Sequence, residues 1–236
     1  SSGDKNTGLG YNALAGTSAA AAYGDNNTAI GYNALTKIDY GANNNVAVGS
    51  SAGALMTQGS ANAILGSSAL GSWAGYTANS NPQRNVSIGY QSMGVFARSG
   101  SGDNARLTDN IAIGYQAFKG ADLGTDPSTL LQSNIAIGNY ALDATGTNAQ
   151  TGTIAIGHES LSALTNGSAN TAIGYQAGKL MTDNSNNVII GYQAFDAANS
   201  GESNNVIIGQ SAGGSIDHAD SDNNVLIGNN AGLGGA

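Results

Sequence analysis

The chain has 236 residues, of which only 9% are charged, with 36 glycines, no cysteine and a formal net charge of −8. This acidic balance disfavours nucleic-acid binding, because phosphate backbones are bound by lysine and arginine, and it disfavours an anionic membrane surface. No apolar run approaches the roughly 18 residues of a membrane-spanning helix, so we expect no membrane insertion. The lack of cysteine is compatible with an extracellular protein that is stabilised by repetition instead of disulfides.

A short phrase recurs along the whole chain: Asn, three mostly apolar residues, Gly, two further residues, then Ala or Ser. Clear copies are NTAIGYNAL from Asn27, NIAIGYQAF from Asn110 and NTAIGYQAG from Asn170. Alignment on the glycine gives twelve copies, at Gly10, Gly31, Gly49, Gly66, Gly89, Gly114, Gly138, Gly157, Gly174, Gly191, Gly209 and Gly228. A short period that is sustained from end to end predicts a repeat architecture.

Each copy predicts a short β-strand, a turn and a second short strand. The segment Val188, Ile189 and Ile190 is β-branched and too short for a helix. Because side chains alternate along a strand, its two faces carry different residues. The residue before the glycine is Leu, Ile or Val in every copy, so it is predicted to face the interior of a coil. The preceding residue, mostly Ala, then needs cover from an opposing strand or from another chain.

The residues that flank the strand predict ladders along the stack. Glycine is expected to turn the chain at positive φ. Asparagine stands four residues earlier in eleven copies, with Thr153 as the exception, and stacked asparagine amides can form a hydrogen-bonded ladder. The predicted ladder asparagines are Asn27, Asn45, Asn110, Asn134, Asn170, Asn187, Asn205 and Asn224. Tyrosine follows the glycine in six copies, which form three neighbouring pairs that should stack: Tyr11 with Tyr32, Tyr90 with Tyr115, and Tyr175 with Tyr192.

The spacing of the glycines predicts where the chain departs from the minimal coil. The shortest interval is 17 residues, and the three longest, 23, 25 and 24, follow one another between Gly66 and Gly138. Extra residues are predicted as loop insertions at about 71–84, 94–109 and 119–133. The predicted fold is therefore all-β, a parallel β-solenoid of about twelve coils that forms a single domain over residues 1–236.

The three insertions contain the only tryptophan and all the arginines of the chain. Aromatic residues with arginine are typical of binding hot spots, and loops often carry function. The candidate ligand-binding residues are Trp73, Tyr76, Arg84, Phe96, Arg98 and Arg106. They would offer a lobe to an acidic glycan or to an adjacent fibre chain. The alternative is a small satellite core, in which Trp73 is buried and the arginines pair locally with Asp103, Asp109 or Asp122.

Other motifs give no chemistry of their own. The letters GSSAG at 49–53 and GQSAG at 209–213 match a nucleophile elbow, but they fall on the repeat, so we expect a coincidence. Asp217, His218, Asp220 and Asp222 form an acidic loop that would either hold a cation through oxygen ligands or be a solvated turn. We expect no enzyme activity and no cofactor.

The phrases NTAIGYNAL, NVAVG and NVIIG resemble the head repeats of trimeric autotransporter adhesins (YadA-like) and similar arrays in phage tail fibres. The resemblance covers nearly the whole chain. It implies a left-handed parallel β-roll, three chains side by side as a homotrimer, and adhesion or host recognition at a cell surface or on a virion. The longer coils and the Tyr or Gln after the glycine are closer to the tail-fibre branch. The alternative function is a subunit of a self-assembling extracellular filament that stacks head to tail.

Overall fold

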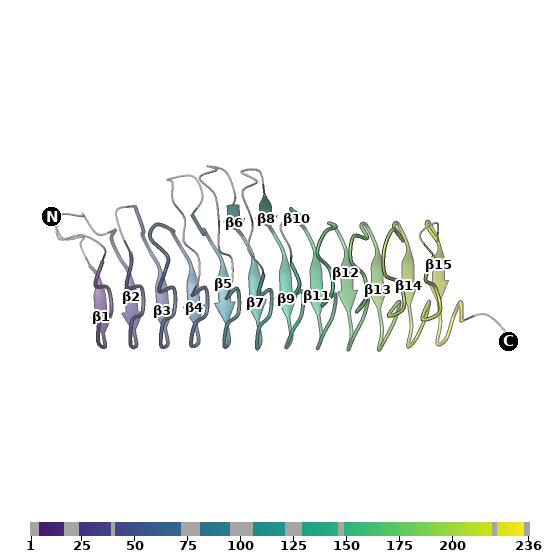
Figure 1. Ribbon diagram of the computed structural model, residues 1–236, viewed down its shortest axis with the longest axis horizontal. Coiled ribbons are helices and arrows are strands. Elements are labelled where there is room, and N and C mark those ends of the chain that lie inside the picture. The colour runs from purple at the N-terminus through teal and green to yellow at the C-terminus, as the bar shows by residue number, and fades with distance from the viewer. Residues whose placement is uncertain are drawn as a thin grey trace.

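The computed structural model describes residues 5–16, 24–38, 41–71, 81–94, 106–120, 129–145, 149–218 and 221–233. In these residues the chain forms two parallel β-sheets and no helix, and the strands of the larger sheet stand side by side in one long row (Figure 1). The prediction of an all-β parallel β-solenoid is confirmed.

The larger sheet has twelve strands, and each pairs in register with the strand of the neighbouring coil. Its strands are β1 (Thr7–Leu9), β2 (Thr28–Ile30), β3 (Val46–Val48), β4 (Ala63–Leu65), β5 (Val86–Ile88), β7 (Ile111–Ile113), β9 (Ile135–Ile137), β11 (Ile154–Ile156), β12 (Thr171–Ile173), β13 (Val188–Ile190), β14 (Val206–Ile208) and β15 (Val225–Ile227). Ala172 pairs with Ile189 and Ile173 with Ile190, for example. Equivalent side chains therefore form columns along the stack.

A smaller sheet lies above the middle of the row in Figure 1. It consists of β6 (Arg106–Thr108), β8 (Leu130–Gln132) and β10 (Gln150–Thr151), in the order β10-β8-β6. Isolated bridges from Gln83 to Ser60 and Thr108 extend this ladder. The sequence predicts a second strand in every unit, but within the described residues the other coils return through turns and bends. The second strand is therefore a feature of the middle coils.

The inward face of the strands is the opposite of the predicted one. In the main sheet the middle residue of every strand from β2 to β14, such as Ala172 or Ile189, is fully buried, whereas Gly8 of β1 is exposed and Leu226 of β15 is half-buried. The residue before the glycine points outward, and Ile173 at this position is 37% exposed. The prediction that this bulky position faces the interior is therefore wrong. The coil is narrow, and the middle residue shares its interior with the buried alanine three residues after the glycine, such as Ala177, so small side chains fit inside.

At the middle position of the strand, bulky residues occur only where the coil provides space. Ile64, Ile189, Ile207 and Leu226 replace the usual small middle residue. Each lies beside a glycine that occupies a position where other coils have leucine, methionine or phenylalanine. A Cβ added to Gly178 would lie 2.8 Å from Leu161 Cδ2 and 3.1 Å from Ile189 Cδ1. The core is thus filled by alternating large and small residues on neighbouring coils.

The corner glycines form a column in which each backbone lies directly against the next. Their φ angles lie between 128° and 146°, so the predicted positive φ is confirmed. A Cβ on Gly114 would lie 2.6 Å from the carbonyl oxygen of Gly138. Both the backbone angle and the close approach exclude other residues here.

Candidate functional site

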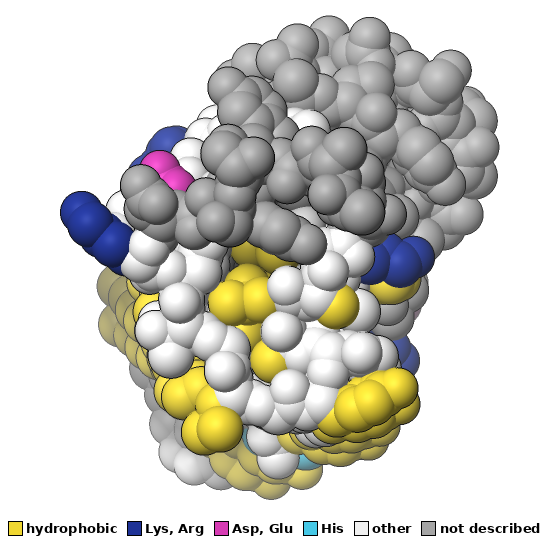
Figure 2. Space-filling model, turned by 90° about the vertical axis from the view of Figure 1, so that its left-hand side faces the viewer, with side chains coloured by type: hydrophobic (Ala, Val, Ile, Leu, Met, Phe, Trp, Pro, Cys, Tyr) yellow, Lys and Arg dark blue, Asp and Glu magenta, His cyan; other side chains and the backbone are white. Residues whose placement is uncertain are grey.

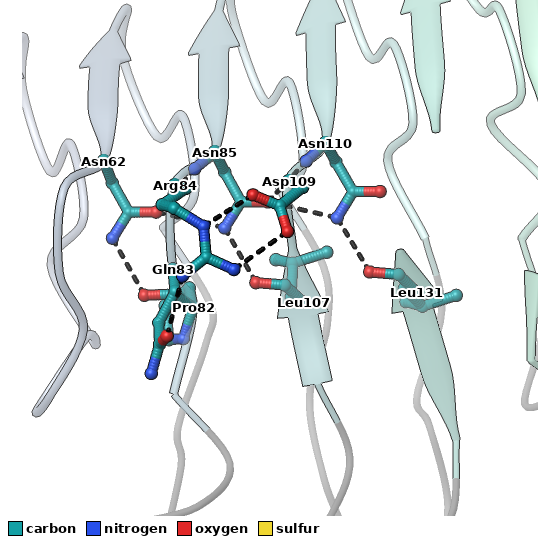
Figure 3. A network of polar contacts seen from close by, with 9 residues as sticks. All are labelled: Asn62, Pro82, Gln83, Arg84, Asn85, Leu107, Asp109, Asn110 and Leu131. Atoms are coloured by element: carbon teal, nitrogen blue, oxygen red, sulfur yellow. Dashed lines mark hydrogen bonds and ion pairs between the residues drawn. The ribbon is translucent and has the colours of Figure 1, made fainter. Parts of the chain in front are cut away.

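The buried asparagines form a continuous amide ladder in the middle of the molecule (Figure 3). Asn85 Nδ2 donates to the carbonyl of Leu107 at 2.8 Å, which ties the two ends of one coil together. Asn85 Oδ1 accepts from the backbone N and the Nδ2 of Asn110 at 3.1 and 3.0 Å. Each amide therefore closes its own coil and links it to the next one.

The same contacts recur along the chain, and they include all the asparagines that the sequence assigned to the ladder: Asn27, Asn45, Asn110, Asn134, Asn170, Asn187, Asn205 and Asn224. Thr153 interrupts the ladder. Its backbone N donates to Asn134 Oδ1 at 3.0 Å, but its buried Oγ1 has no hydrogen-bond partner. Because these amides are hydrogen-bonded within the chain, we assign the ladder to stabilisation of the fold and not to ligand binding.

The outward positions of the main sheet form an apolar face. The first and third residues of the twelve strands include no charged residue. Val46, Leu65 and Ile227, for example, are 43%, 40% and 65% exposed. In the end-on view of Figure 2, apolar side chains form bands that run back along the lower part of the stack. Large exposed apolar surfaces are typical of interaction sites.

An aromatic row follows the corner glycines. Tyr90 and Tyr115 stack with ring centroids 5.5 Å apart, and Tyr175 and Tyr192 stack at 5.2 Å. Tyr11 and Tyr32 form a separate stacked pair at 5.6 Å. Between the first two pairs, Tyr140 packs edge-on against Tyr115 at 5.2 Å. The three predicted tyrosine pairs therefore stack in the structure.

His158 completes the row of rings. It lies 6.1 Å from Tyr140 and 5.3 Å from Tyr175, between centroids. The row from Tyr90 to Tyr192 thus includes six rings on six successive coils, one ring from each of β5, β7, β9, β11, β12 and β13. Loss of water around its phenol raises the pKa of Tyr140 above the usual value.

A polar row accompanies the aromatic one. Gln193 donates to Gln176 at 2.9 Å, and Gln176 donates to Glu159 Oε2 at 2.6 Å. Lys179 Nζ lies 2.7 Å from the same carboxylate oxygen. Hydrogen bonds from Lys179 and then Gln176 hold the pKa of Glu159 below its usual range. These groups fix the turn that follows the tyrosines.

The predicted binding lobe is only partly described. Trp73, Tyr76, Phe96 and Arg98 lie outside the described residues. The backbone of Arg106 begins β6. These five candidates therefore remain predictions.

Arg84 is the predicted lobe residue whose side chain the structure describes. It forms a two-pronged pair with Asp109, at 2.6 Å from Nε to Oδ1 and 2.8 Å from Nη2 to Oδ2 (Figure 3). The hydrogen bond from Arg84 lowers the pKa of Asp109. This local pairing is the arrangement that the packing alternative predicts for an arginine.

The ends of the three long insertions lie on neighbouring coils. At the side where the insertions begin, Leu70 N donates to Ser92 O and Met93 N to Ala117 O, both at 3.0 Å. At the side where they return, Gln83 N donates to Leu107 O at 3.0 Å, and Leu107 pairs with Leu131. The insertions therefore leave and rejoin the solenoid side by side.

The remaining motifs do not form a reactive site in the described part of the chain. Ser51 and Ser211 of the two serine motifs adopt φ angles of 57° and 52° at ordinary coil corners, and no helix follows them as a nucleophile elbow requires. In the acidic loop, Asp222 Oδ1 accepts from Ser203 N at 2.6 Å, and Asp220 lies outside the description. No group of three potential metal ligands occurs among the described residues.

Among the described residues, the chain has no helix of the length and hydrophobicity needed to cross a bilayer. Comparison of the chain with protein-family models, with curated proteins and with solved structures found no match.

Proposed function

We propose that the chain is an extracellular structural and adhesive fibre protein, related to the YadA-like heads and tail-fibre rolls that its repeats resemble. In this proposal a left-handed roll of about twelve coils holds the three insertions in place for surface or receptor binding. The observation that carries the proposal is that these insertions begin and return on adjacent coils of a rigid stack. Neighbouring parallel strands lie about 4.8 Å apart, so the insertions emerge within a short length of the rod.

The proposed assembly is a homotrimer through the outward apolar face. The twelve-stranded sheet presents two columns of side chains, and neither contains a charge. Large exposed apolar patches are typical of interaction surfaces, so a long uncharged face favours burial against other chains. In a homotrimer, the equivalent apolar faces of the second and third copies would cover this face.

The proposed ligand is a cell-surface glycan or a protein receptor, and the protein acts without an enzymatic step or a cofactor. Aromatic rings can pack against a sugar, and arginine can bind a carboxylate in a two-pronged geometry. The net charge of −8 makes the arginines of the insertions an unusual concentration of positive charge. An acidic glycan is therefore the ligand class that fits best.

The test of the binding function is Trp73→Ala combined with Arg98→Ala, followed by cell or glycan binding and by thermal melting. Lys37→Ala is the matched control, because it removes an exposed positive charge outside the insertions. The proposal predicts lost binding with an unchanged melting temperature for the double variant and unchanged binding for the control. A lowered melting temperature with intact binding would assign the insertions to packing and would overturn the binding site.

The assembly is tested separately with Ile137→Lys and Ile156→Lys, which place charges on the outward face of β9 and β11. Light scattering should show a trimer for the native chain and a monomer for the double variant. Asn199→Lys adds the same charge at an exposed position away from these strands and should leave the trimer intact. A native chain that is monomeric at micromolar concentration would contradict the trimer.

The second candidate function, a head-to-tail filament, is favoured by the uniform pairing of the main sheet, in which each coil pairs with the next in the same parallel register. The head-to-tail arrangement would place β1 of one copy against β15 of another. Electron micrographs of the native protein, compared with a variant that lacks residues 232–236, test it: polymer that shortens in the variant supports a filament, and no polymer at any concentration excludes it.

A further inference from the structure

The register of the main sheet brings tyrosine side chains of successive coils into contact. Tyr175 and Tyr192 stack at 5.2 Å with an interplanar angle of 10°. Tyr90 and Tyr115 stack at 5.5 Å and 15°. The two phenols of each pair are therefore held together before any ligand or partner binds.

The rings are accessible, although each one stacks on its partner. Tyr175 and Tyr192 are 42% and 50% exposed, and Tyr90 and Tyr115 are 46% and 40% exposed. A small oxidant or an oxidising enzyme can reach the exposed part of each ring.

We propose that the stacked tyrosine pairs are sites of oxidative coupling, in which a haem peroxidase and hydrogen peroxide convert each pair to dityrosine. The inference concerns the aromatic row and does not depend on the adhesive function. The product is a covalent link between neighbouring coils of one chain.

The chemistry requires only the two phenols and one equivalent of peroxide. Each tyrosine loses one electron and its phenolic proton to give a tyrosyl radical. The two radicals form a bond between ring carbons ortho to the oxygens, and each ring then moves a proton from that carbon to its oxygen and becomes aromatic again. The two hydrogen atoms that are removed reduce one hydrogen peroxide to two molecules of water.

Geometry selects which tyrosines couple. Radicals that form on neighbouring stacked rings meet by rotation of exposed side chains, whereas radicals on distant coils are kept apart by the rigid stack. Tyr32 has only one possible partner for coupling among the residues after the corner glycines of the adjacent coils, because Ser50 occupies the equivalent position on the next coil. Tyr32 therefore has a stacked partner on one side, Tyr11.

The experiment treats dilute native protein with a peroxidase and a limiting amount of hydrogen peroxide, then unfolds and digests it with trypsin for mass spectrometry. Cleavage after Lys and Arg separates the members of two pairs. Coupling of Tyr90 with Tyr115 joins peptides 85–98 and 107–119, and coupling of Tyr175 with Tyr192 joins peptides 120–179 and 180–236. We expect these two products to dominate, with an internal link in peptide 6–37 from Tyr11 and Tyr32.

Two variants and one condition control the result. Tyr192→Phe keeps an aromatic ring and should abolish only the link between peptides 120–179 and 180–236. Tyr140→Phe should leave both links unchanged, which assigns the link in peptide 120–179 to Tyr175. Oxidation in urea should give a broad mixture of links. A native product mixture equal to the one in urea, or a link that persists in Tyr192→Phe, would overturn the proposal.

Discussion

The middle coils and the C-terminal coils place different side chains at the same buried position, three residues before a ladder asparagine. In both regions the asparagine before the strand donates to a carbonyl three residues before the next asparagine. In the middle, the residue with that carbonyl is Leu107 or Leu131, and its side chain is buried in the core. Towards the C-terminus, Asn184 and Glu202 occupy the same place and are equally buried.

In the C-terminal coils, the buried polar side chains Asn184 and Glu202 form a hydrogen-bond network. Asn184 Nδ2 donates to Glu202 Oε2 at 2.7 Å and to the Glu202 carbonyl at 3.1 Å. The Glu202 carbonyl also accepts from Asn187 at 2.9 Å. The coil therefore requires the carbonyl, whereas the side chain and the length of the preceding segment vary. The strand of the main sheet and its corner glycine are constant from coil to coil, whereas the segment that returns to the next strand varies in length and contains the insertions.

The largest expected loss of stability comes from substitution of a corner glycine, which is constant in both regions. Gly114→Ala combines a φ of 138° with a Cβ only 2.6 Å from the Gly138 carbonyl oxygen, so we expect a loss of about 4 kcal/mol or more in the free energy of unfolding. Gly191→Ala in the C-terminal region should cost as much. The control is Gly152→Ala, where φ is 68° and no atom lies within 4 Å of the added Cβ; it should cost about 1 kcal/mol. Urea unfolding measures all three, and a mild effect at either corner would break the equivalence of the two regions.

Exchange of side chains between the regions gives the next largest effect. Leu131→Glu places a carboxylate in an apolar site without a partner, and we expect a loss of about 3–5 kcal/mol. The reverse change, Glu202→Leu, removes the acceptor of the buried Asn184 Nδ2 and leaves one N–H of this amide unpaired, so we expect a loss of about 1–3 kcal/mol. Thermal melting of both variants at neutral pH is the measurement. An unchanged or raised melting temperature for Glu202→Leu would show that the polar network is not needed for stability.

The complementarity of core sizes predicts a coupled pair. Gly178→Leu adds a side chain against Ile189 and Leu161, and overpacking of this kind costs about 1–3 kcal/mol. Ile189→Ala in the same chain recreates the leucine and alanine combination of other coils, such as Leu35 with Ala47 of the next strand, and should recover most of that loss. The left-handed φ at this position is compatible with leucine, because Leu35 adopts a φ of 47°. Additive effects in a double-mutant cycle would contradict the size rule.

The smallest effect is expected from the exposed pair Arg84 and Asp109. The pKa of Asp109 is lower in the folded chain, so the pair contributes stability above the ordinary pKa of aspartate, about 3.9. That contribution is lost as the pH falls through the lower folded value. Arg84→Gln should return the pKa of Asp109 towards its ordinary range in an NMR titration, with little change in melting temperature at neutral pH. An unchanged titration would mean that the pair does not persist in solution.

The sequence predicted those features that depend on fixed offsets within the repeat. The strand, the corner glycine, the asparagine and the tyrosine pairs recur at constant distances, so their columns follow from stacking alone. The inward face was predicted wrongly because bulky residues such as Ile173 were expected inside, whereas the width of the coil admits Ala172. The second sheet has a weaker signal in the sequence, because Leu107 and Leu131 stand at the same distance before an asparagine.

The backbone conformation of the corners has a consequence for how the chain reaches this structure. Three positions of each coil adopt left-handed φ angles even without glycine, such as Asn26, Asn33 and Leu35 at 59°, 54° and 47°. Such angles are unfavourable for a free chain, so a single coil in isolation lacks the local preference to form. A coil that is already complete supplies the carbonyls and amides that hold these angles in the next one. We therefore expect folding to nucleate slowly on a few coils and then propagate coil by coil along the axis.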